Sequence, residues 1–295
     1  MPPSNDPQSL QHHPAALTVD VEDYFHPELV RRHAPPEWRE ARVEASTLPI
    51  LDLLERYQVH ATFFIVGEVI RSAPRLVKRI AGDGHEIGCH THTHRPLWEL
   101  TPDSFRDELR NFRAALRDVV GDIPVHGFRA PTFSLDRRTD WCYRVLEEEG
   151  FSYDSSIVPA RGPLYGCPDA PREIYRPARE DFLKRDPSGP IVEFPAPVVD
   201  LVGGRLPVGG GLYLRALPFW IYWRFVKRVL RERPFFLYVH PWETDPEIPK
   251  CRLPGFSRWA TYWGIGGMLK KLERLLQRIR FTTMRSTLEA SGFGV

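Results

Sequence analysis

Two histidines four residues apart, His90 and His94, are the first residues in this sequence whose types and spacing could do chemistry. Neutral imidazole is the commonest metal ligand at neutral pH, and one helical turn would let two rings at this spacing converge. His92, between them, would then point away. A third, acidic ligand is still needed, and Asp20-Val21-Glu22-Asp23 supplies candidates. Two histidines and a carboxylate with open positions are typical of a zinc centre that activates water.

Three further residues could act beside such a centre. Arg129, fixed by a proline two residues on, could orient a carboxylate by a bidentate bond, although a lone arginine is usually solvated. His240 ends an apolar run and could protonate a leaving amine, or be an ordinary core histidine. Asp154 could hold that imidazole in the right tautomer, or serve only as a turn residue.

Short apolar runs alternate with helical patterns along the chain. Strands are predicted at 15–21, 61–67, 86–89, 125–129, 151–154, 191–194, 235–239 and 280–283, and helices at 46–57, 74–81, 101–120, 139–150, 218–231 and 267–278. This alternation indicates a parallel α/β sheet or barrel. The candidate residues each follow a predicted strand, which is the edge where active sites form in parallel α/β folds.

Composition narrows the class of protein. The net charge of +2 gives no reason to expect nucleic-acid binding, and the four cysteines have no CxxC spacing for a thiolate metal site or redox pair. Residues 1–14 are polar and predicted to be a disordered tail rather than a signal peptide. With no long apolar run, the sequence predicts a cytoplasmic protein. Helix 267–278 has a basic face that could touch a membrane, but an outer barrel helix is the favoured interpretation.

Taken together, these motifs resemble the polysaccharide deacetylases with a NodB-homology domain, carbohydrate esterase family four. The similarity is greatest to the branch associated with exopolysaccharide and exosortase-type loci. Five segments carry the resemblance in order: Thr18 to Phe25, His90-Thr91-His92-Thr93-His94, Arg129-Ala130-Pro131, Asp154, and Leu237-Tyr238-Val239-His240. The resemblance implies a distorted (β/α)7-type barrel over residues 15–245. Residues 246–295 are then expected as a C-terminal extension packed on the same barrel.

The resemblance also implies roles for the polar residues. His90 and His94 would bind a divalent metal, Zn²⁺ above others. Asp20 would be the general base that deprotonates the metal-bound water, held and tuned by Arg129. His240 would be the general acid.

Other residues would support the acid or contact the substrate. Asp154 would support His240, and the backbone N–H of Thr132 would help to stabilise the oxyanion. Leu237 would line a pocket for the acetyl methyl group. Trp242 follows His240 by two residues and is the tryptophan best placed to pack on a sugar ring.

The first motif departs from the family pattern, which has two adjacent aspartates. Val21 stands at the second position and cannot bind a metal. Register with relatives that have an acid-x-acid pattern favours Glu22 as the acidic ligand, whereas side-chain length favours Asp23. Both remain open from sequence.

The resulting hypothesis is a hydrolase of non-peptide carbon–nitrogen bonds. It would remove N-acetyl groups from amino sugars of a polysaccharide or a lipid-linked oligosaccharide, with metal-activated water attacking the acetamide. One alternative is an allantoin-type small-amide hydrolase on the same fold. The other is a catalytically silent carbohydrate-binding or assembly protein of an exopolysaccharide machinery. Peripheral contact with a membrane or with that machinery stays open from sequence. The sequence does not predict the oligomeric state.

Overall fold

Strand β1 (Ala15–Val21) is buried along its whole length and lies at the centre of a parallel, eight-stranded sheet. In the computed structural model, which describes residues 12–295 except 36, 38 and 163, β1 pairs with β2, β9 and β10. The other strands follow in the order β2-β3-β4-β5-β6. Their bounds are β2 (Thr62–Ile65), β3 (Glu86–Cys89), β4 (Gly127–Phe128), β5 (Tyr153–Asp154), β6 (Val192–Glu193), β9 (Phe235–Val239) and β10 (Phe281–Thr282).

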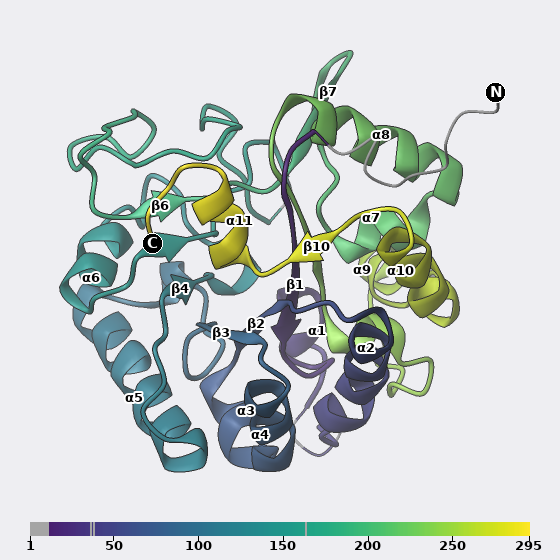
Figure 1. Ribbon diagram of the computed structural model, residues 1–295. Coiled ribbons are helices and arrows are strands. Elements are labelled where there is room, and N and C mark those ends of the chain that lie inside the picture. The colour runs from purple at the N-terminus through teal and green to yellow at the C-terminus, as the bar shows by residue number, and fades with distance from the viewer. Residues whose placement is uncertain (1–11, 36, 38, 163) are drawn as a thin grey trace.

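The sheet curls into a half-barrel, which confirms the predicted distorted (β/α) barrel (Figure 1). Strand residues alternate between its two faces. On β1, Leu17, Val19 and Val21 join the larger core between the sheet and the helices. Ala16 instead joins a smaller cluster with the aromatic rings of Phe64 and Phe236, which fill the inside of the curl. This parity decides which polar residues can reach the site at the carboxyl ends of the strands.

Helices cover the outer side of the sheet in chain order (Figure 1). Each of the six predicted helices has a counterpart, and α10 buries its leucines as expected of an outer helix. The helices are α1 (Glu28–Arg31), α2 (Val43–Tyr57), α3 (Gly67–Ser72), α4 (Pro74–Gly82), α5 (Pro102–Val120), α6 (Cys142–Glu148), α7 (Gly211–Ala216), α8 (Phe219–Glu232), α9 (Gly255–Tyr262), α10 (Met268–Leu276) and α11 (Met284–Ala290).

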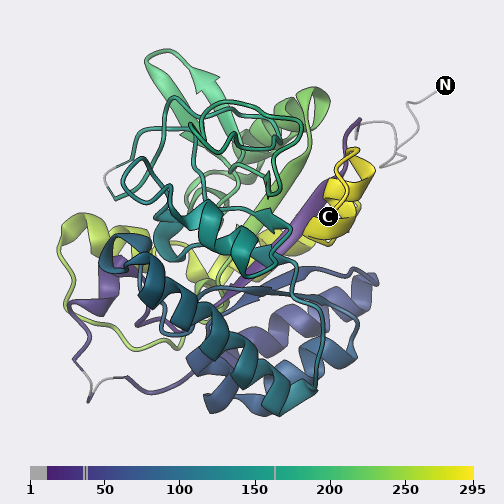
Figure 2. The same ribbon diagram turned by 90° about the vertical axis from the view of Figure 1, so that its left-hand side faces the viewer.

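Between β5 and β6 the described residues run as loops without a named helix or strand (Figure 2). An antiparallel hairpin of β7 (Val198–Leu201) and β8 (Gly204–Pro207) was not predicted from sequence, and neither were α1, α3, α7, α9 and α11. Residues 246–295 contribute β10 to the sheet and place α11 against β1. The division at residue 245 remains a prediction. Residues 1–11 of the predicted disordered tail are not among the residues that the structure describes.

Candidate functional site

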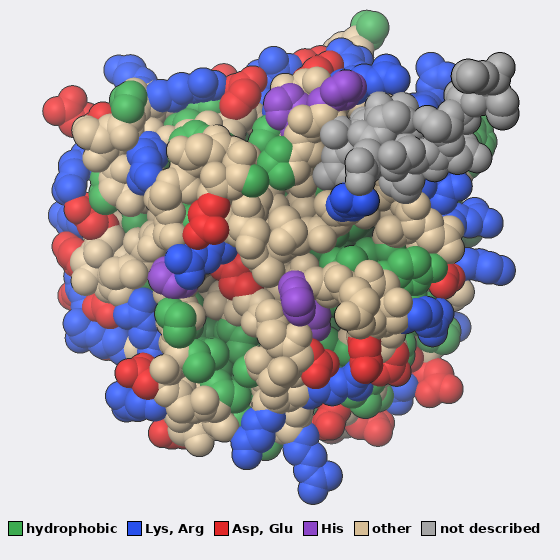
Figure 3. Space-filling view, in the orientation of Figure 1, with side chains coloured by type: hydrophobic (Ala, Val, Ile, Leu, Met, Phe, Trp, Pro, Cys, Tyr) green, Lys and Arg blue, Asp and Glu red, His purple; other side chains and the backbone are tan. Residues whose placement is uncertain are grey.

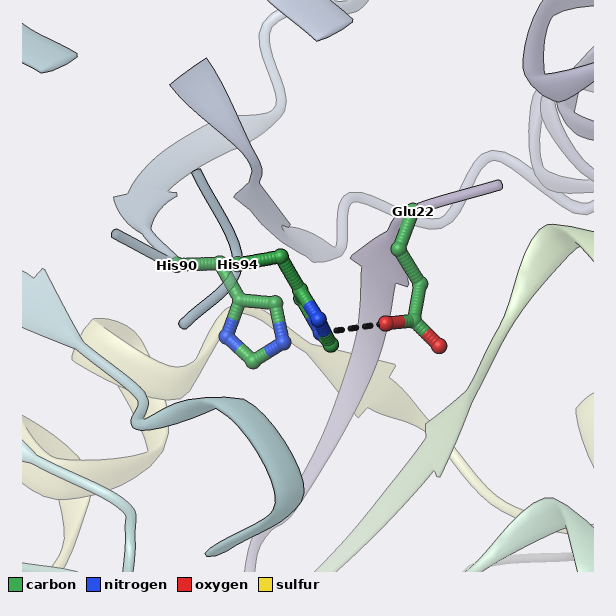
Figure 4. A group of neighbouring side chains, drawn as sticks. All are labelled: Glu22, His90 and His94. Atoms are coloured by element: carbon green, nitrogen blue, oxygen red, sulfur yellow. Dashed lines mark ion pairs between the residues drawn. The ribbon is translucent and has the colours of Figure 1, made fainter. Parts of the chain in front are cut away.

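Glu22, His90 and His94 converge at the carboxyl ends of β1 and β3 (Figure 4). One ligand atom from each residue lies within 4.8 Å of the other two, and all three side chains are buried. Within the described part of the chain, this is the group of His, Cys, Asp and Glu side chains that meets the geometry of a metal site. Two imidazole nitrogens and one carboxylate oxygen suit Zn²⁺.

The two histidines meet through a tight loop rather than through the helical turn that their spacing would also allow. Residues 90–94 are not helical, and Thr91 and His94 have left-handed backbones with φ of 60° and 57°. Glu108 on α5 holds this loop by accepting the backbone N–H groups of His92 and Thr93, each at 2.7 Å. The spacing of four residues was therefore informative, although a loop rather than a helix produces the convergence.

The hydrogen bonds of the histidines leave nitrogens available for a metal. His90 Nδ1 lies 2.7 Å from the carbonyl oxygen of Arg129, which can only accept, so Nδ1 carries the proton and Nε2 keeps its lone pair. Burial lowers the pKa of His90 to about 4, which favours the neutral, metal-binding form. His94 Nε2 points at the Glu22 carboxylate and forms an ion pair with it (Figure 4). The residues present therefore fit a divalent ion.

The structure separates the two candidate acidic ligands. Val21 packs on the helix side of β1, and the chain then turns so that Glu22 enters the site. The Trp242 indole N–H donates to Glu22 Oε1 at 3.0 Å and fixes the carboxylate. Asp23 points elsewhere: its Oδ2 accepts the backbone N–H groups of Arg42 and Val43, at 2.7 and 3.0 Å, at the start of α2. Only Glu22 lies in the metal-type cluster.

Asp20 and Arg129 form a buried ion pair beside this cluster. One guanidinium nitrogen of Arg129 donates to Asp20 Oδ1 at 2.7 Å and to Thr18 Oγ1 at 2.8 Å. The guanidinium lies against the rings of Phe64 and Phe236, at 4.3 and 4.9 Å from their centroids, inside the curled sheet. This arrangement fixes one oxygen of Asp20 and leaves the other, Oδ2, on the side of His240.

His240 lies on the opposite side of the cluster, with Nε2 3.7 Å from Glu22 Oε1 and 3.9 Å from Asp20 Oδ2. Its Nδ1 and backbone N–H both lie within hydrogen-bonding distance of Glu243 Oε2, at 3.1 and 3.0 Å. Burial lowers the pKa of His240, but the hydrogen bond to Glu243 and the nearby carboxylates raise it to about 9. Arg215 Nε donates to the other oxygen of Glu243 at 2.9 Å.

Sequence reasoning missed Glu243 and Arg215. The spacing His240-Pro241-Trp242-Glu243 is a capping box at the start of a short 3₁₀ helix, and this signal could have found the glutamate. Nothing in the sequence pointed to Arg215, which is contributed by α7.

Asp154 does not contact His240, and this expectation is corrected by the structure. It pairs in register with Glu193 on the neighbouring strand, and Ser156 Oγ donates to its Oδ1 at 2.5 Å. The Tyr143 hydroxyl on α6 donates to Glu193 at 3.0 Å. The physical reason is strand parity: Tyr153 occupies the inside of the curl, so Asp154 sits on the other face of β5.

A cavity of about 140 Å³ opens beside the cluster, and Asp20, His90, His94 and His240 all line it. Thr132 and Trp242 line it as predicted, and Thr132 has a left-handed backbone with φ of 59°. Leu237 does not: it packs in the core between sheet and helices. Its neighbour Tyr238 lines the cavity instead. The prediction for Leu237 is therefore wrong, because side chains alternate along the strand and the next residue faces the cavity.

Comparison with known proteins finds two matching family models. Residues 16–151 match the family model for polysaccharide deacetylase, and residues 155–289 match a domain of unknown function (DUF3473). The first match confirms the polysaccharide deacetylase domain that the motifs indicated, whereas the comparisons do not test the resemblance to the exopolysaccharide branch.

Individual relatives agree with this assignment. An uncharacterised protein of Geobacillus stearothermophilus is 33% identical over 132 residues, which cover 38% of this chain and 49% of the relative. A peptidoglycan-N-acetylglucosamine deacetylase of Bacillus cereus is 40% identical over 78 residues, covering 26% of this chain and 28% of the relative. The chain thus spans half or less of the length of these two relatives.

A solved structure supports the fold. It is that of a Mycobacterium smegmatis protein described as a candidate polysaccharide deacetylase, and it superposes with a TM-score of 0.63 at 18% identity. The match covers 96% of this chain and 90% of that one.

Among the described residues, no helix is long and apolar enough to cross a membrane.

Proposed function

We propose that this protein is a metal-dependent hydrolase that removes N-acetyl groups from amino sugars of a polysaccharide or its precursor. The observation that carries the proposal is the convergence of Glu22, His90 and His94 with Asp20 and His240 around one cavity. Relatives named as peptidoglycan-N-acetylglucosamine and chitooligosaccharide deacetylases support the choice of substrate class. The resemblance to the exopolysaccharide branch suggests an exopolysaccharide as the polymer.

Glu22, His90 and His94 would hold the divalent ion, for which Zn²⁺ is our first choice. When bound, such an ion acts as a Lewis acid that polarises a carbonyl and lowers the pKa of water. The remaining chemistry falls to the chain. Trp242 fixes Glu22 through its indole N–H, and Arg129 fixes Asp20.

Asp20 accepts the proton of the attacking water in this scheme, because Arg129 holds one of its oxygens and the other faces the site. His240 Nε2 donates a proton to the departing amine nitrogen, while Glu243 on Nδ1 fixes the tautomer and the ring orientation. Thr132 and Tyr238 border the space for the acetamide. Acetate and a free amino sugar result.

The test is acetate release from an N-acetylglucosamine oligomer, measured with metal-stripped protein before and after addition of zinc. We expect release only with metal, and none from His94→Ala. The matched control is His92→Ala in the same loop, because His92 packs against Gly67 and is absent from the cluster. Zinc binding without acetate release from several N-acetylated oligomers would contradict the proposal, and so would full activity of His94→Ala.

A further inference from the structure

Helix α9 exposes three large aromatic side chains on one face. Phe256, Trp259 and Trp263 are 59%, 42% and 57% exposed, which is unusual for residues of this size. They follow one another at spacings of three and four, so they lie side by side along the helix and the residue that ends it. The rings of Phe256 and Trp259 have centroids 6.1 Å apart. In Figure 2 the yellow-green segment containing α9 lies at the outer edge of the molecule, beside α1.

The charge around this face has one sign. Residues 248–272 contain no aspartate or glutamate. Lys250, Arg252 and Arg258 in this stretch are exposed and make no ion pair with any described residue. Many cations elsewhere on the surface are paired: Arg79, for example, pairs with Asp52 at 2.8 Å, and Figure 3 shows acidic and basic side chains interspersed on the face that carries α2 and α11. The α9 face therefore has uncompensated positive charge beside its aromatic rings.

The aromatic rings face away from the cavity. Ala260 and Thr261, on the other side of α9, line the cavity, whereas Phe256, Trp259 and Trp263 do not. Rings that stack on a sugar chain would be expected along the walls of a groove. An outward row of amphipathic aromatics with neighbouring cations instead matches the water–lipid interface, where rings enter the head-group region and cations meet anionic head groups.

The backbone under this face is firmly held. The Arg215 guanidinium donates to the carbonyl oxygens of Ala260, Thr261 and Trp263. The Tyr262 hydroxyl accepts the backbone N–H of Cys251 at 2.8 Å. Because the helix is fixed in place, the rings are presented without any need for rearrangement.

We propose that the α9 face, defined as Lys250, Arg252, Phe256, Arg258, Trp259 and Trp263, docks the protein on the surface of an anionic phospholipid bilayer. The rings enter the interface and the cations contact head-group phosphates. Because the other side of α9 lines the cavity, docking places the cavity close to the bilayer. That last consequence rests on the proposed function, whereas docking itself does not.

The test is co-sedimentation of the full-length protein with vesicles, which needs no enzymatic readout. We expect binding to vesicles of phosphatidylcholine mixed with phosphatidylglycerol, weaker binding to phosphatidylcholine alone, and release at high salt. Two variants, Trp259→Ala/Trp263→Ala and Arg252→Glu/Arg258→Glu, should each weaken partitioning by at least about tenfold. The matched control is Trp220→Ala, which removes a 66%-exposed tryptophan from α8 and should bind as the parent does.

Three outcomes would overturn the proposal. One is a parent protein that stays in the supernatant with anionic vesicles. Another is a loss of vesicle binding in Trp220→Ala as large as in the α9 variants, because binding could then not be assigned to the α9 face. The third is a protein that does not bind vesicles but binds N-acetylglucosamine oligomers through Trp259 and Trp263. The α9 face would then be a glycan-binding surface. Circular dichroism of each variant shows that it is folded, and acetate release, measured separately, tests the catalytic proposal without affecting this one.

Discussion

Two clusters of buried carboxyl groups in this protein have pKa values shifted in opposite directions. Glu22 is 2% exposed, and Asp154 and Glu193 are fully buried. Burial alone would raise the pKa of all three. The pKa of Glu22 is nevertheless lowered, because His94, His240 and His90 surround it. The pKa of Asp154 is raised to about 6, chiefly by burial, and that of Glu193 is raised well above its usual value by burial and by Asp154.

The comparison shows that neighbours, rather than depth, decide what a buried carboxyl can do. Glu22 meets imidazole rings and an indole N–H, so it stays ionised and is suited to a cation. Asp154 meets a second carboxyl, so one of the two is suited to keep a proton. That shared proton would also supply a partner for Asp154 Oδ2, which otherwise has none among the described residues. The first cluster therefore suits the proposed metal ion, whereas Asp154 and Glu193 do not line the cavity.

The largest effect is expected from Glu22→Gln, which removes the charge of the first cluster and keeps its shape. Zinc affinity should fall by at least about a hundredfold, because an amide oxygen is a much weaker ligand than a carboxylate. Isothermal titration with zinc measures this. Asp23→Asn is the control and should bind zinc as the parent does, since Asp23 faces α2. Unchanged affinity in Glu22→Gln, or loss in Asp23→Asn, would exchange the roles of the two acids.

The next effect separates Glu243 from Asp154 as the partner of His240. Glu243→Gln should lower kcat for acetate release about 10- to 100-fold with little change in KM, because the imidazole loses its orienting carboxylate. Asp154→Asn should leave kcat within about twofold, because Asp154 does not contact His240. Steady-state kinetics on both variants decides. A larger loss of kcat in Asp154→Asn than in Glu243→Gln would mean that Asp154 supports His240, as the resemblance to the family implied.

The second cluster should be visible in the pH dependence of stability. The folded-state pKa of Asp154 lies above its ordinary value of 3.8. Its stabilising contribution to the free energy of unfolding is therefore fully present below pH 3.8 and is lost as the pH rises through about 6. Glu193→Gln removes the like charge; its amide oxygen can still accept the backbone N–H of Ile157, and its NH2 group can donate to the Tyr143 hydroxyl oxygen.

Urea unfolding at about pH 4.5 and about pH 7.5 measures the difference. Between these two conditions the parent should lose on the order of 2 kcal/mol more unfolding free energy than Glu193→Gln. Parallel curves for the two proteins would mean that the carboxyls do not share a proton.

The smallest effect concerns Asp23, the acid next to the first cluster. It accepts the N–H groups at the start of α2, so Asp23→Ala should lower the unfolding free energy by about 1 kcal/mol. Thermal or urea unfolding gives the value. A far larger loss would mean that Asp23 does more than cap a helix.

The sequence predicted the sheet well because hydrophobic runs specify buried parallel strands directly. All eight predicted strands have counterparts, and residues at the carboxyl ends of β1, β3 and β9 meet at the cavity as expected. The α9 helix and the β7–β8 hairpin were missed, since tertiary contacts rather than periodicity define such short elements. Side-chain parity was the main source of error within the site. Leu237 and Asp154 lie on strands, where a shift of one residue changes the face.

The loop histidines illustrate a different limit. A spacing of four suggested a helix, but two left-handed residues, Thr91 and His94, produce the same convergence. Propensity gives no sign of this, because non-glycine residues rarely adopt that conformation unless tertiary structure enforces it. Glu108, sixteen residues beyond His92, supplies the enforcing hydrogen bonds.

The pairing of β1 with β9 and β10 has a consequence for the order in which the protein can assemble during synthesis. Ala15 pairs with Phe235 and Phe281, so β1 waits for two strands that lie far later in the sequence before its edges are covered. Glu22, His90 and His94 are synthesised long before His240. A nascent chain can therefore bring these three residues together early, whereas the cavity that they share with His240 forms only once β9 has joined the sheet.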